Sequence, residues 1–409
     1  MEVAEYVRSL ALKARAAAGE LARATRGEKD AALEAMAAAL EKNAETIAAA
    51  NAADVEKAKA NGLAPAMVDR LTLTPARFQS MVEGVRHVAS LPDPVGATLG
   101  TRTRPSGITI RKVRVPLGVI AVVFESRPNV FVDTAALCLK TGNAVILRGG
   151  KEAIETNKAL AKAVREALGA LADAVQLVEI LDHEAVTELV RAVGLVDVAI
   201  PRGGERLIRA MCEAALVPVL KHYKGVCHVY VDEAADLGMA LSILDNAKTQ
   251  RPGVCNAAEC LLVHRKLVPL FLPMVKAWAK DRGVTLHINE ELRSKNEECD
   301  WTREFLALEI NVGFVENVQA AIEHINKHGS HHSDCIVTND AARAAEFLQD
   351  VDSACVYHNV STRFTDGGEF GMGAEIGIST DKLHARGPMG LEELCTYKYQ
   401  VSGDGVVRK

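Results

Sequence analysis

One cysteine of this chain stands where a turn is expected between a helix and a strand. Pro252 and Gly253 favour a turn just before Cys255, so its sulfur is expected on a loop rather than in a core. Lys248 and Arg251 lie close by in the sequence, and positive charge favours the thiolate, which is the nucleophilic form of cysteine. Cys255 is therefore a candidate nucleophile. The alternative is that it is one more small, buried and inert side chain among the nine cysteines.

Two glycine-rich turns follow apolar runs and could hold phosphate groups. Glycines allow a phosphate to approach the backbone N–H groups at the start of a helix. Two such turns at the ends of neighbouring strands would form the crevice that a dinucleotide requires. A flexible helix start without any ligand is the alternative. The candidate residues are Arg148, Gly149, Gly150 and Lys151 in the first turn, and Gly203 and Gly204 in the second.

Other catalytic patterns are weaker. Four histidines lie between residues 324 and 332, but Gly329 and Ser330 break the helix that would align them. No cysteine or carboxylate stands at a supporting spacing, so we expect no metal site. The sequence also contains no serine-centred elbow and no P-loop. The thiol therefore remains the centre of the expected chemistry.

The elements that must position these residues follow from the spacing of apolar side chains. Residues 1–62 are rich in Ala, Glu and Lys, and Leu33, Met36 and Leu40 fall on one helical face, which predicts packed helices up to about residue 95. From about residue 107, short apolar runs alternate with helical patterns, which is typical of βαβ units in a parallel, doubly wound sheet. A second series begins near residue 228 and contains Cys255. The predicted strands are 108–113, 119–124, 144–147, 175–178, 196–200, 228–232, 260–263, 284–288, 335–338, 355–357 and 396–401.

Length and composition are those of a globular protein with two or three domains, because 409 residues exceed one ordinary core. Lys and Arg number 48 against 53 Asp and Glu, which gives no basic footprint for nucleic acid or a membrane surface. No apolar stretch approaches the roughly 18 residues of a membrane span. The acidic start does not resemble a secretory signal. The cysteines are accordingly expected to be reduced thiols of a cytoplasmic protein.

Five runs between about residues 105 and 400 carry a resemblance to a known family. They resemble, in order, runs of the gamma-glutamyl phosphate reductases, the glutamate-5-semialdehyde dehydrogenases of proline biosynthesis. That family belongs to the aldehyde dehydrogenase superfamily. The Ala-rich first 100 residues carry little of the resemblance. The matching runs are Glu125–Val130, Thr141–Lys151, Gln250–Asn256, Ser361–Gly368 and His384–Leu391.

The resemblance implies an α/β fold of the aldehyde dehydrogenase type, with two doubly wound parallel-sheet domains and a β oligomerisation arm. It therefore also implies a homo-oligomer. Residues 1–104 and 121–225 would form the cofactor-binding domain, 226–357 the catalytic domain with the thiol loop, 105–120 and 383–409 the arm, and 358–382 a Gly-rich segment at the domain interface.

The resemblance further implies NADPH-dependent reduction of L-glutamyl 5-phosphate to L-glutamate 5-semialdehyde with release of phosphate. The Cys255 thiolate would displace phosphate to form a thioester, and reduction of the thioester would give the aldehyde. Both stages place negative charge on oxygen, for which the Cys255 N–H and the Asn129 side-chain amide are candidate donors. Asn129 could instead cap the following helix.

Two departures from hydrolytic aldehyde dehydrogenases support this interpretation. Those enzymes carry a glutamate base before the thiol, whereas the comparable stretch here, Lys221–Gly225, contains no carboxylate. Without a base to activate water, the thioester can exchange with phosphate, although His222, assigned to the substrate site, could act as a weak base. Members that prefer NAD place a glutamate where Lys151 stands here, beside Arg148. Cations at these positions suit the 2′-phosphate of NADP(H).

The remaining site residues would bind the charged groups of substrate and cofactor. Arg127 and Arg363 are candidates for the anionic groups, because guanidinium forks suit carboxylate and phosphate. Ser361 and Thr362 could add hydroxyl donors. Structural salt bridges are the alternative for both arginines. Glu304 is assigned to the nicotinamide ribose, with a surface carboxylate as its alternative.

Two other functions remain open. A hydrolytic dehydrogenase of a small amino-acid semialdehyde would turn over without phosphate, whereas an acyl-phosphate reductase requires it. A catalytically silent scaffold would use the fold as a surface for a partner, such as the glutamate 5-kinase that makes the labile substrate. Transient contact with that kinase is also expected of the active enzyme. No nucleic acid or membrane partner is expected.

Overall fold

The computed structural model describes residues 2–289, 292 and 300–408, and the chain divides into two compact units. Each unit contains a parallel sheet with helices packed against it, so the predicted α/β fold with parallel sheets is confirmed. The first unit comprises Met1–Lys221, Met372–Gly377 and Met389–Lys409, and the second comprises His222–Gly371 and Ile378–Pro388.

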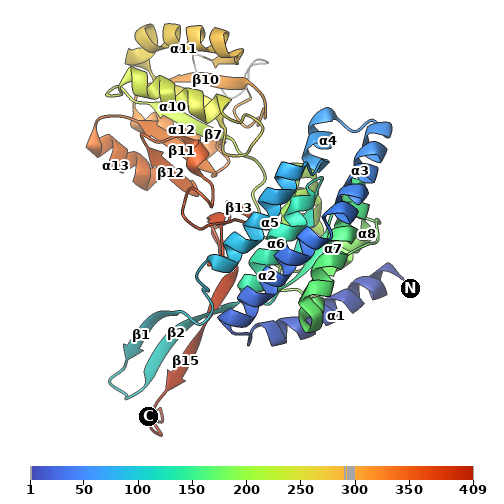
Figure 1. Ribbon diagram of the computed structural model, residues 1–409. Coiled ribbons are helices and arrows are strands. Elements are labelled where there is room, and N and C mark those ends of the chain that lie inside the picture. The colour runs from blue at the N-terminus through green and yellow to red at the C-terminus, as the bar shows by residue number, and fades with distance from the viewer. Residues whose placement is uncertain (1, 290–291, 293–299, 409) are drawn as a thin grey trace. The chain divides into compact units, whose positions relative to one another are not determined.

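Five helices open the first unit, as the Ala-rich pattern predicts. Thr25 and Glu28 form a reciprocal capping box that starts the second helix, and Leu33, Met36 and Leu40 on its predicted face are fully buried. α2 lies beside α5 and α7, while α3 also packs on α7 (Figure 1). The five helices are α1 (Val3–Leu21), α2 (Arg26–Lys42), α3 (Ala44–Ala60), α4 (Pro65–Leu71) and α5 (Pro75–Ser90).

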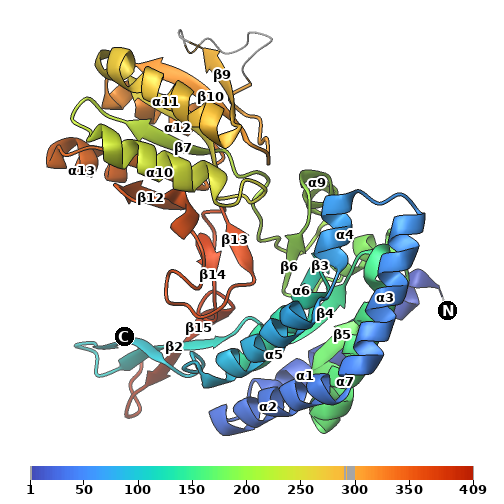
Figure 2. The same ribbon diagram turned by 45° about the horizontal axis from the view of Figure 1, so that its top comes forward.

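The sheet of the first unit has four parallel strands in the order β5-β4-β3-β6 (Figure 2). β3 and β4 are buried at every position, which explains their unbroken apolar sequences. The strands are β3 (Val119–Phe124), β4 (Ala144–Arg148), β5 (Val175–Leu177) and β6 (Val198–Arg202). The helices that follow them are α6 (Pro128–Lys140), η1 (Lys151–Ala153), α7 (Ile154–Leu168), η2 (Gly169–Ala174), α8 (Glu184–Val190) and α9 (Glu205–Ala214).

An antiparallel sheet of β1 (Thr98–Thr103), β2 (Thr109–Pro116) and β15 (Cys395–Ser402) also belongs to the first unit (Figure 1). β2 is the central strand, and its register pairs Thr109 with Ser402 and Pro116 with Cys395. The strand expected at the C-terminal end of the sequence therefore has a partner within its own chain. β1 and nearly all of β15 are exposed, including Tyr397 and Tyr399.

The second unit has a parallel sheet of six strands in the order β12-β11-β7-β8-β10-β9. Side chains alternate between two cores: Val229 and Val231 face α10 and α11, whereas Tyr230 packs with α12 and α13. The strands are β7 (Cys227–Val231), β8 (Ala258–His264), β9 (Thr285–Asn289), β10 (Glu309–Val315), β11 (Ser333–Val337) and β12 (Cys355–His358). The helices are α10 (Leu237–Thr249), η3 (Arg265–Leu267), α11 (Val268–Arg282), α12 (Val318–His328), α13 (Ala341–Asp350) and η4 (Thr362–Phe364).

Four of the described strands were not predicted from sequence patterns: β1, β10, β13 (Gly377–Ser379) and β14 (Gly387–Met389). β10 lies inside the second sheet, between β8 and β9, and its apolar run is interrupted by Asn311 and Gly313. The short strands β13 and β14 pair with each other. In the part of the chain that the structure describes, no helix combines the length and apolarity needed to cross a membrane.

Candidate active site

Cys255 lies on the turn between α10 and β8, as the sequence predicts. α10 ends at Thr249 and β8 begins at Ala258, so both ends of the turn are anchored in regular structure. Cys255 is half-buried, and Cys212 is the other partly exposed cysteine among those the structure describes. Burial raises the pKa of a fully enclosed thiol such as Cys227 well above its ordinary value. Cys255 is thus the accessible thiol on a loop.

The backbone of Gly225 packs directly on the backbone of Cys255. A Cβ atom at Gly225 would lie 1.8 Å from the Cys255 carbonyl oxygen and 2.4 Å from its Cα. The Gly225 N–H donates to Glu304 Oε1 at 2.8 Å, and the Cys227 thiol donates to the Cys255 carbonyl oxygen at 3.2 Å. These contacts fix the turn from the side of β7. They also place Glu304, assigned from the sequence to the cofactor, beside the thiol loop.

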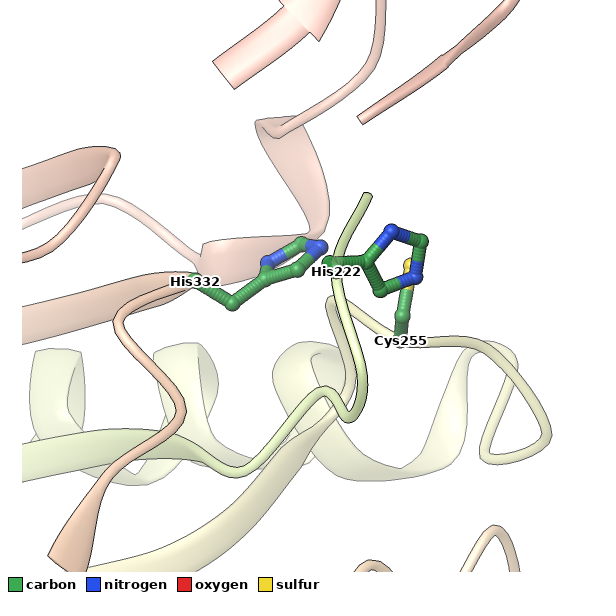
Figure 3. Close-up of side chains that lie close together, drawn as sticks. All are labelled: His222, Cys255 and His332. Atoms are coloured by element: carbon green, nitrogen blue, oxygen red, sulfur yellow. The ribbon is translucent and has the colours of Figure 1, made fainter. Parts of the chain in front are cut away.

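Two imidazoles from distant parts of the sequence lie beside the Cys255 thiol (Figure 3). The sulfur and one ring nitrogen each of His222 and His332 all lie within 4.8 Å of one another. His222 Nδ1 is 2.9 Å from the carbonyl oxygen of Ile378, so Nδ1–H must donate and the neutral ring keeps its lone pair at Nε2. His332 is fully buried, and burial, followed by the charge of His222, holds its pKa well below the usual value.

The order of the strands explains why these residues meet. β11, β7 and β8 are neighbours in a parallel sheet, so their amino ends lie at one edge. His332 immediately precedes β11, His222 lies shortly before β7, and Cys255 shortly before β8. Sequence reasoning missed His332 as a neighbour of the thiol, because the two are brought together only by this strand order.

The expectation that Lys248 directs its positive charge at Cys255 is wrong. Lys248 is fully buried, and its Nζ donates to Glu259 Oε2 at 2.9 Å. Burial raises the pKa of Glu259 to about 7, and the charge of Lys248 opposes that shift. This pair joins the end of α10 to β8 and braces the turn. The Lys248 charge is therefore balanced by Glu259 rather than directed at Cys255, whereas Arg251 is exposed.

The Gly-rich segment after β12 is tied to the residue beside the nucleophile. Asn256 Nδ2 donates to the Thr365 carbonyl oxygen at 2.8 Å, and the Thr362 hydroxyl donates to the Asn256 carbonyl oxygen at 2.7 Å. The Ser361 hydroxyl accepts from the Arg363 N–H at 3.3 Å. Sequence reasoning assigned Ser361 and Thr362 to the substrate. In the structure the Thr362 hydroxyl holds this segment to the turn, and the Ser361 hydroxyl caps η4 within the segment.

Arg363 lies among the groups around the thiol. Its guanidinium donates to Asn256 Oδ1, and its Nε donates to Gln250 Oε1 at 2.7 Å. Burial and then the nearby charge of Arg251 lower the pKa of Arg363, while the charge of Cys255 acts in the opposite direction. Two neighbouring arginines repel each other, and an anion between them would relieve that repulsion.

Asn129 and Arg127 belong to the first unit. Arg127 is the N-cap residue of α6 without a side-chain capping bond, and Asn129 is the second residue of the helix. The alternative that Asn129 caps the helix is therefore wrong. Its Nδ2 donates to Asp133 Oδ2 at 3.0 Å, one turn further along. Burial raises the pKa of Asp133 to about 6, and this bond and the charge of Arg202 partly offset the shift.

The turn after β4 contains the first predicted phosphate site. Arg148 is buried, and its guanidinium donates to the carbonyl oxygens of Gly149 at 2.8 Å and Leu181 at 2.9 Å. Lys151, the first residue of η1, is exposed. A Cβ atom at Gly149 would lie 2.1 Å from the buried Asn157 side chain, whereas one at Gly150 would meet only the flexible end of Glu152, so close packing constrains Gly149 more strongly. Lys151 is consequently the predicted cation that solvent or a ligand can reach.

The turn after β6 contains the second predicted phosphate site. Glu125 Oε2 accepts from the Gly204 N–H at 2.9 Å at the start of α9, and a Cβ atom at Gly203 would lie 2.5 Å from the same oxygen. The backbone of this turn therefore already donates a hydrogen bond to one carboxylate oxygen. The expectation that both turns end neighbouring strands is wrong, because β3 separates β4 from β6. The strand order reverses at β3, and ligands of open parallel sheets bind at such a reversal.

The four clustered histidines do not act together. His324 packs between the rings of His228, His328 and Trp301, and burial lowers its pKa to about 2. Among the four, His332 is the one found within reach of Cys255.

Comparison with known proteins adds the family context. The aldehyde dehydrogenase family model matches residues 2–293. The gamma-glutamyl phosphate reductase of Thermobifida fusca is 51% identical over 416 residues, covering 100% of both chains. The one of Moorella thermoacetica is 52% identical over 418 residues with the same coverage. The crystal structure of gamma-glutamyl phosphate reductase from Thermotoga maritima matches with a TM-score of 0.96 at 44% identity, covering 98% of this chain and 100% of that one.

Proposed function

The chain belongs to the aldehyde dehydrogenase family, and within it to the gamma-glutamyl phosphate reductases, and we propose that it works through a thioester on Cys255. The reaction is the reduction of L-glutamyl 5-phosphate to L-glutamate 5-semialdehyde with release of phosphate, a step of proline biosynthesis. The observation that carries the proposed mechanism is the half-buried Cys255 on a braced turn, with His222 beside its sulfur.

His222 is suited to accept the thiol proton. Its Nδ1–H donates to the Ile378 carbonyl oxygen, so Nε2 is the basic nitrogen of the neutral ring. The resulting Cys255 thiolate attacks the acyl carbon of the substrate, the bond from that carbon to the phosphate oxygen breaks, and phosphate leaves. An acyl group then remains on the sulfur. His222 thus acts on the thiol in this proposal, in addition to lying in the substrate site.

Negative charge on the acyl oxygen requires hydrogen-bond donors. The N–H of Cys255 is one candidate, and its direction is fixed because Gly225 and Cys227 hold the surrounding turn. Asn129 is the other, since its amide has two N–H groups and one donates to Asp133. Each such donor typically contributes ~100- to 1,000-fold to the rate.

Phosphate, and not water, is the natural acceptor of this acyl group. Lys221–Gly225 contains no carboxylate that could serve as a base for water. Glu304 lies near, but its carboxylate accepts the Gly225 N–H. The positive charges of Arg251 and Arg363 support a phosphate site beside the sulfur. Arg127 remains the candidate for the substrate carboxylate.

The residues of the first unit suit a nicotinamide dinucleotide, the cofactor class of this family, and we propose NADP(H). The turn at Gly203 and Gly204 lies where the strand order reverses. Its Gly204 N–H donates to the Glu125 carboxylate, which supports anion binding at this turn. Lys151 would bind the 2′-phosphate, while Arg148 would shape the turn through its backbone contacts. When bound, the cofactor supplies the hydride that reduces the thioester to a thiohemiacetal. The bond between the former acyl carbon and the Cys255 sulfur then breaks, the aldehyde leaves, and a proton returns to the sulfur.

We further propose that the sheet of β1, β2 and β15 associates with other copies of the chain. Tyr399 is 60% exposed, Val401 59% and Tyr397 47%, which is unusual for neighbouring apolar side chains on one strand. A homo-oligomer would bury them. The contact with the kinase and the cytoplasmic location remain predictions.

Replacement of the thiol tests the mechanism. Cys255→Ser should lower phosphate-dependent oxidation of the semialdehyde by roughly 10,000-fold or more, as expected when a nucleophile is lost. Cys212→Ser, which changes the other half-exposed cysteine among the described residues, is the matched control and should retain the wild-type rate. Brief iodoacetamide labelling should modify Cys255 first, with protection by substrate. Full activity of Cys255→Ser would refute the thioester mechanism. Oxidation of the semialdehyde by the unmodified protein without phosphate would favour the hydrolytic alternative.

A further inference from the structure

The nucleophile and the two imidazoles beside it have the chemistry of a transition-metal site. A cysteine sulfur and two histidine nitrogens are preferred ligands of zinc, and His222, Cys255 and His332 bring these atoms within 4.8 Å of one another (Figure 3). We propose that these three residues form a binding site for Zn²⁺, and that the bound ion reversibly blocks Cys255. The expectation of no metal site, drawn from the sequence, concerned the four histidines between residues 324 and 332, of which His332 belongs to the site proposed here.

The spacing of the three groups is close to what zinc requires. Tetrahedral zinc, with bonds of about 2.0–2.3 Å, holds its ligand atoms about 3.3–3.6 Å apart. An upper separation of 4.8 Å leaves roughly 1.2–1.5 Å to close, which rotation of the half-buried Cys255 side chain can supply. His332 is fully enclosed and provides the fixed point.

The second observation is the environment of the His332 ring. Its Nε2 is buried and has no hydrogen-bond partner among the described residues, which is a costly arrangement for a polar atom. Figure 3 shows the outer end of this ring directed toward His222 and Cys255. A metal ion bound by Nε2 would satisfy this atom.

Both imidazoles also have the outer partners that metal-binding histidines usually have. His222 donates its Nδ1–H to the Ile378 carbonyl oxygen. His332 Nδ1 lies 2.8 Å from Ser333 Oγ, which in turn lies 2.6 Å from Thr365 Oγ1. Such contacts fix the ring orientation and direct Nε2 toward the ion. Both rings are therefore held in orientation by groups on the side away from the thiol.

The position of the site determines its effect. Three protein ligands leave one position for water, as in zinc sites that are not purely structural. Arg363 lies close enough for its charge to interact with that of Cys255, so we expect reversible binding rather than permanent retention of zinc. The blocking effect depends on the proposed role of Cys255 as nucleophile. Metal binding itself does not depend on that role.

The test uses the full-length protein, freed of metal by a chelator and kept reduced by a phosphine, because dithiols bind zinc themselves. Zn²⁺ is titrated against a chromophoric indicator, and Co²⁺ is added separately to detect thiolate-to-cobalt charge transfer. We expect one ion per chain and loss of reductase activity, with recovery after chelation. His332→Asn keeps an amide near the position of Nδ1 but removes Nε2. It should weaken binding at least about 100-fold, because loss of an outer partner alone typically costs 10- to 100-fold.

Three further variants complete the design. Cys255→Ser should abolish the cobalt charge-transfer band, Ser333→Ala should weaken zinc binding roughly 10- to 100-fold, and His328→Asn on α12 should leave zinc binding unchanged. Thermal unfolding checks that each variant folds, and if His332→Asn does not, Cys255→Ser decides the question.

Wild-type zinc affinity in both His332→Asn and Cys255→Ser would overturn the site, and zinc binding without loss of activity would overturn the blocking role. Failure of the proposed thioester mechanism would be distinguishable from failure of the zinc site, because it would appear as reductase activity of the metal-free Cys255→Ser variant.

Discussion

Gly225→Ala is the change that most directly tests how the fold positions the thiol. The new Cβ atom would lie 1.8, 2.3 and 2.4 Å from the carbonyl oxygen, carbonyl carbon and Cα of Cys255. These are backbone atoms and cannot rotate away. Ordinary contact begins at 3.4 Å, so the two segments must separate by about 1.6 Å. Misplacement of a reacting group by about 1 Å can cost ~100-fold in rate, and overpacking typically costs about 1–3 kcal/mol of stability. We therefore expect a folded protein with at least ~100-fold lower activity.

The matched control is Gly253→Ala, on the same turn as Cys255. Its new Cβ atom would have as its nearest contact the Leu306 carbonyl oxygen at 3.8 Å, an ordinary distance, and Gly253 is not among the glycines with positive φ. The assay is phosphate-dependent oxidation of the semialdehyde, combined with iodoacetamide labelling of Cys255 and thermal unfolding. The reasoning would be refuted if Gly225→Ala retained wild-type activity and labelling, or if Gly253→Ala lost as much activity as Gly225→Ala.

Two further predictions concern the first unit. Burial raises the pKa of Asp133 from 3.8 to about 6, so its contribution to stability is present below about pH 4 and is lost as the pH rises through 6. Asp133→Asn should therefore raise the free energy of unfolding by up to about 3 kcal/mol at pH 8 and leave it nearly unchanged at pH 4. Denaturant titrations measure this difference, and equal differences at both pH values would contradict the prediction. Lys151→Glu should lower kcat/KM for NADPH at least ~10-fold relative to NADH, because one charge-assisted hydrogen bond is lost. Lys162→Glu, on the exposed face of α7, is the control, and unchanged selectivity in Lys151→Glu would exclude the role assigned to this lysine.

Elements with a strong local pattern could be predicted from the sequence, and elements determined by their neighbours could not. The run from Val119 to Phe124 is apolar throughout because β3 is covered on both sides. β10 escaped prediction because Asn311 and Gly313 break its pattern. In the structure, the Asn311 side chain donates to the Asp300 carbonyl oxygen at 3.0 Å, and Gly313 leaves room for the Trp301 ring. Both exceptions are explained by contacts with residues outside the strand.

The same distinction applies to the candidate site. Pro252 and Gly253 indicate a turn at Cys255 from local chemistry alone, and the structure has that turn. The charge at Lys248 was misjudged because its partner Glu259 lies on the next strand and is buried with it. Neither burial nor pairing can be derived from the two residues and their separation in the sequence. The substrate roles of Arg127 and Arg363 stay predictions. In a sequence, an arginine that binds a ligand looks the same as one that pairs with other side chains of the protein.

The place of the site in the sheet explains the largest omission. Open parallel sheets usually bind ligands at the carboxyl ends of their strands, which is where the turns after β4 and β6 lie. Cys255, His222 and His332 instead gather at the amino ends of β8, β7 and β11. Gly225 at the same edge fixes the turn by backbone contact alone. A thiol held in this way beside two imidazoles can lose its proton to one of them and can also bind a metal ion with both. The same arrangement therefore explains the proposed reactivity of Cys255 and its proposed inhibition by zinc.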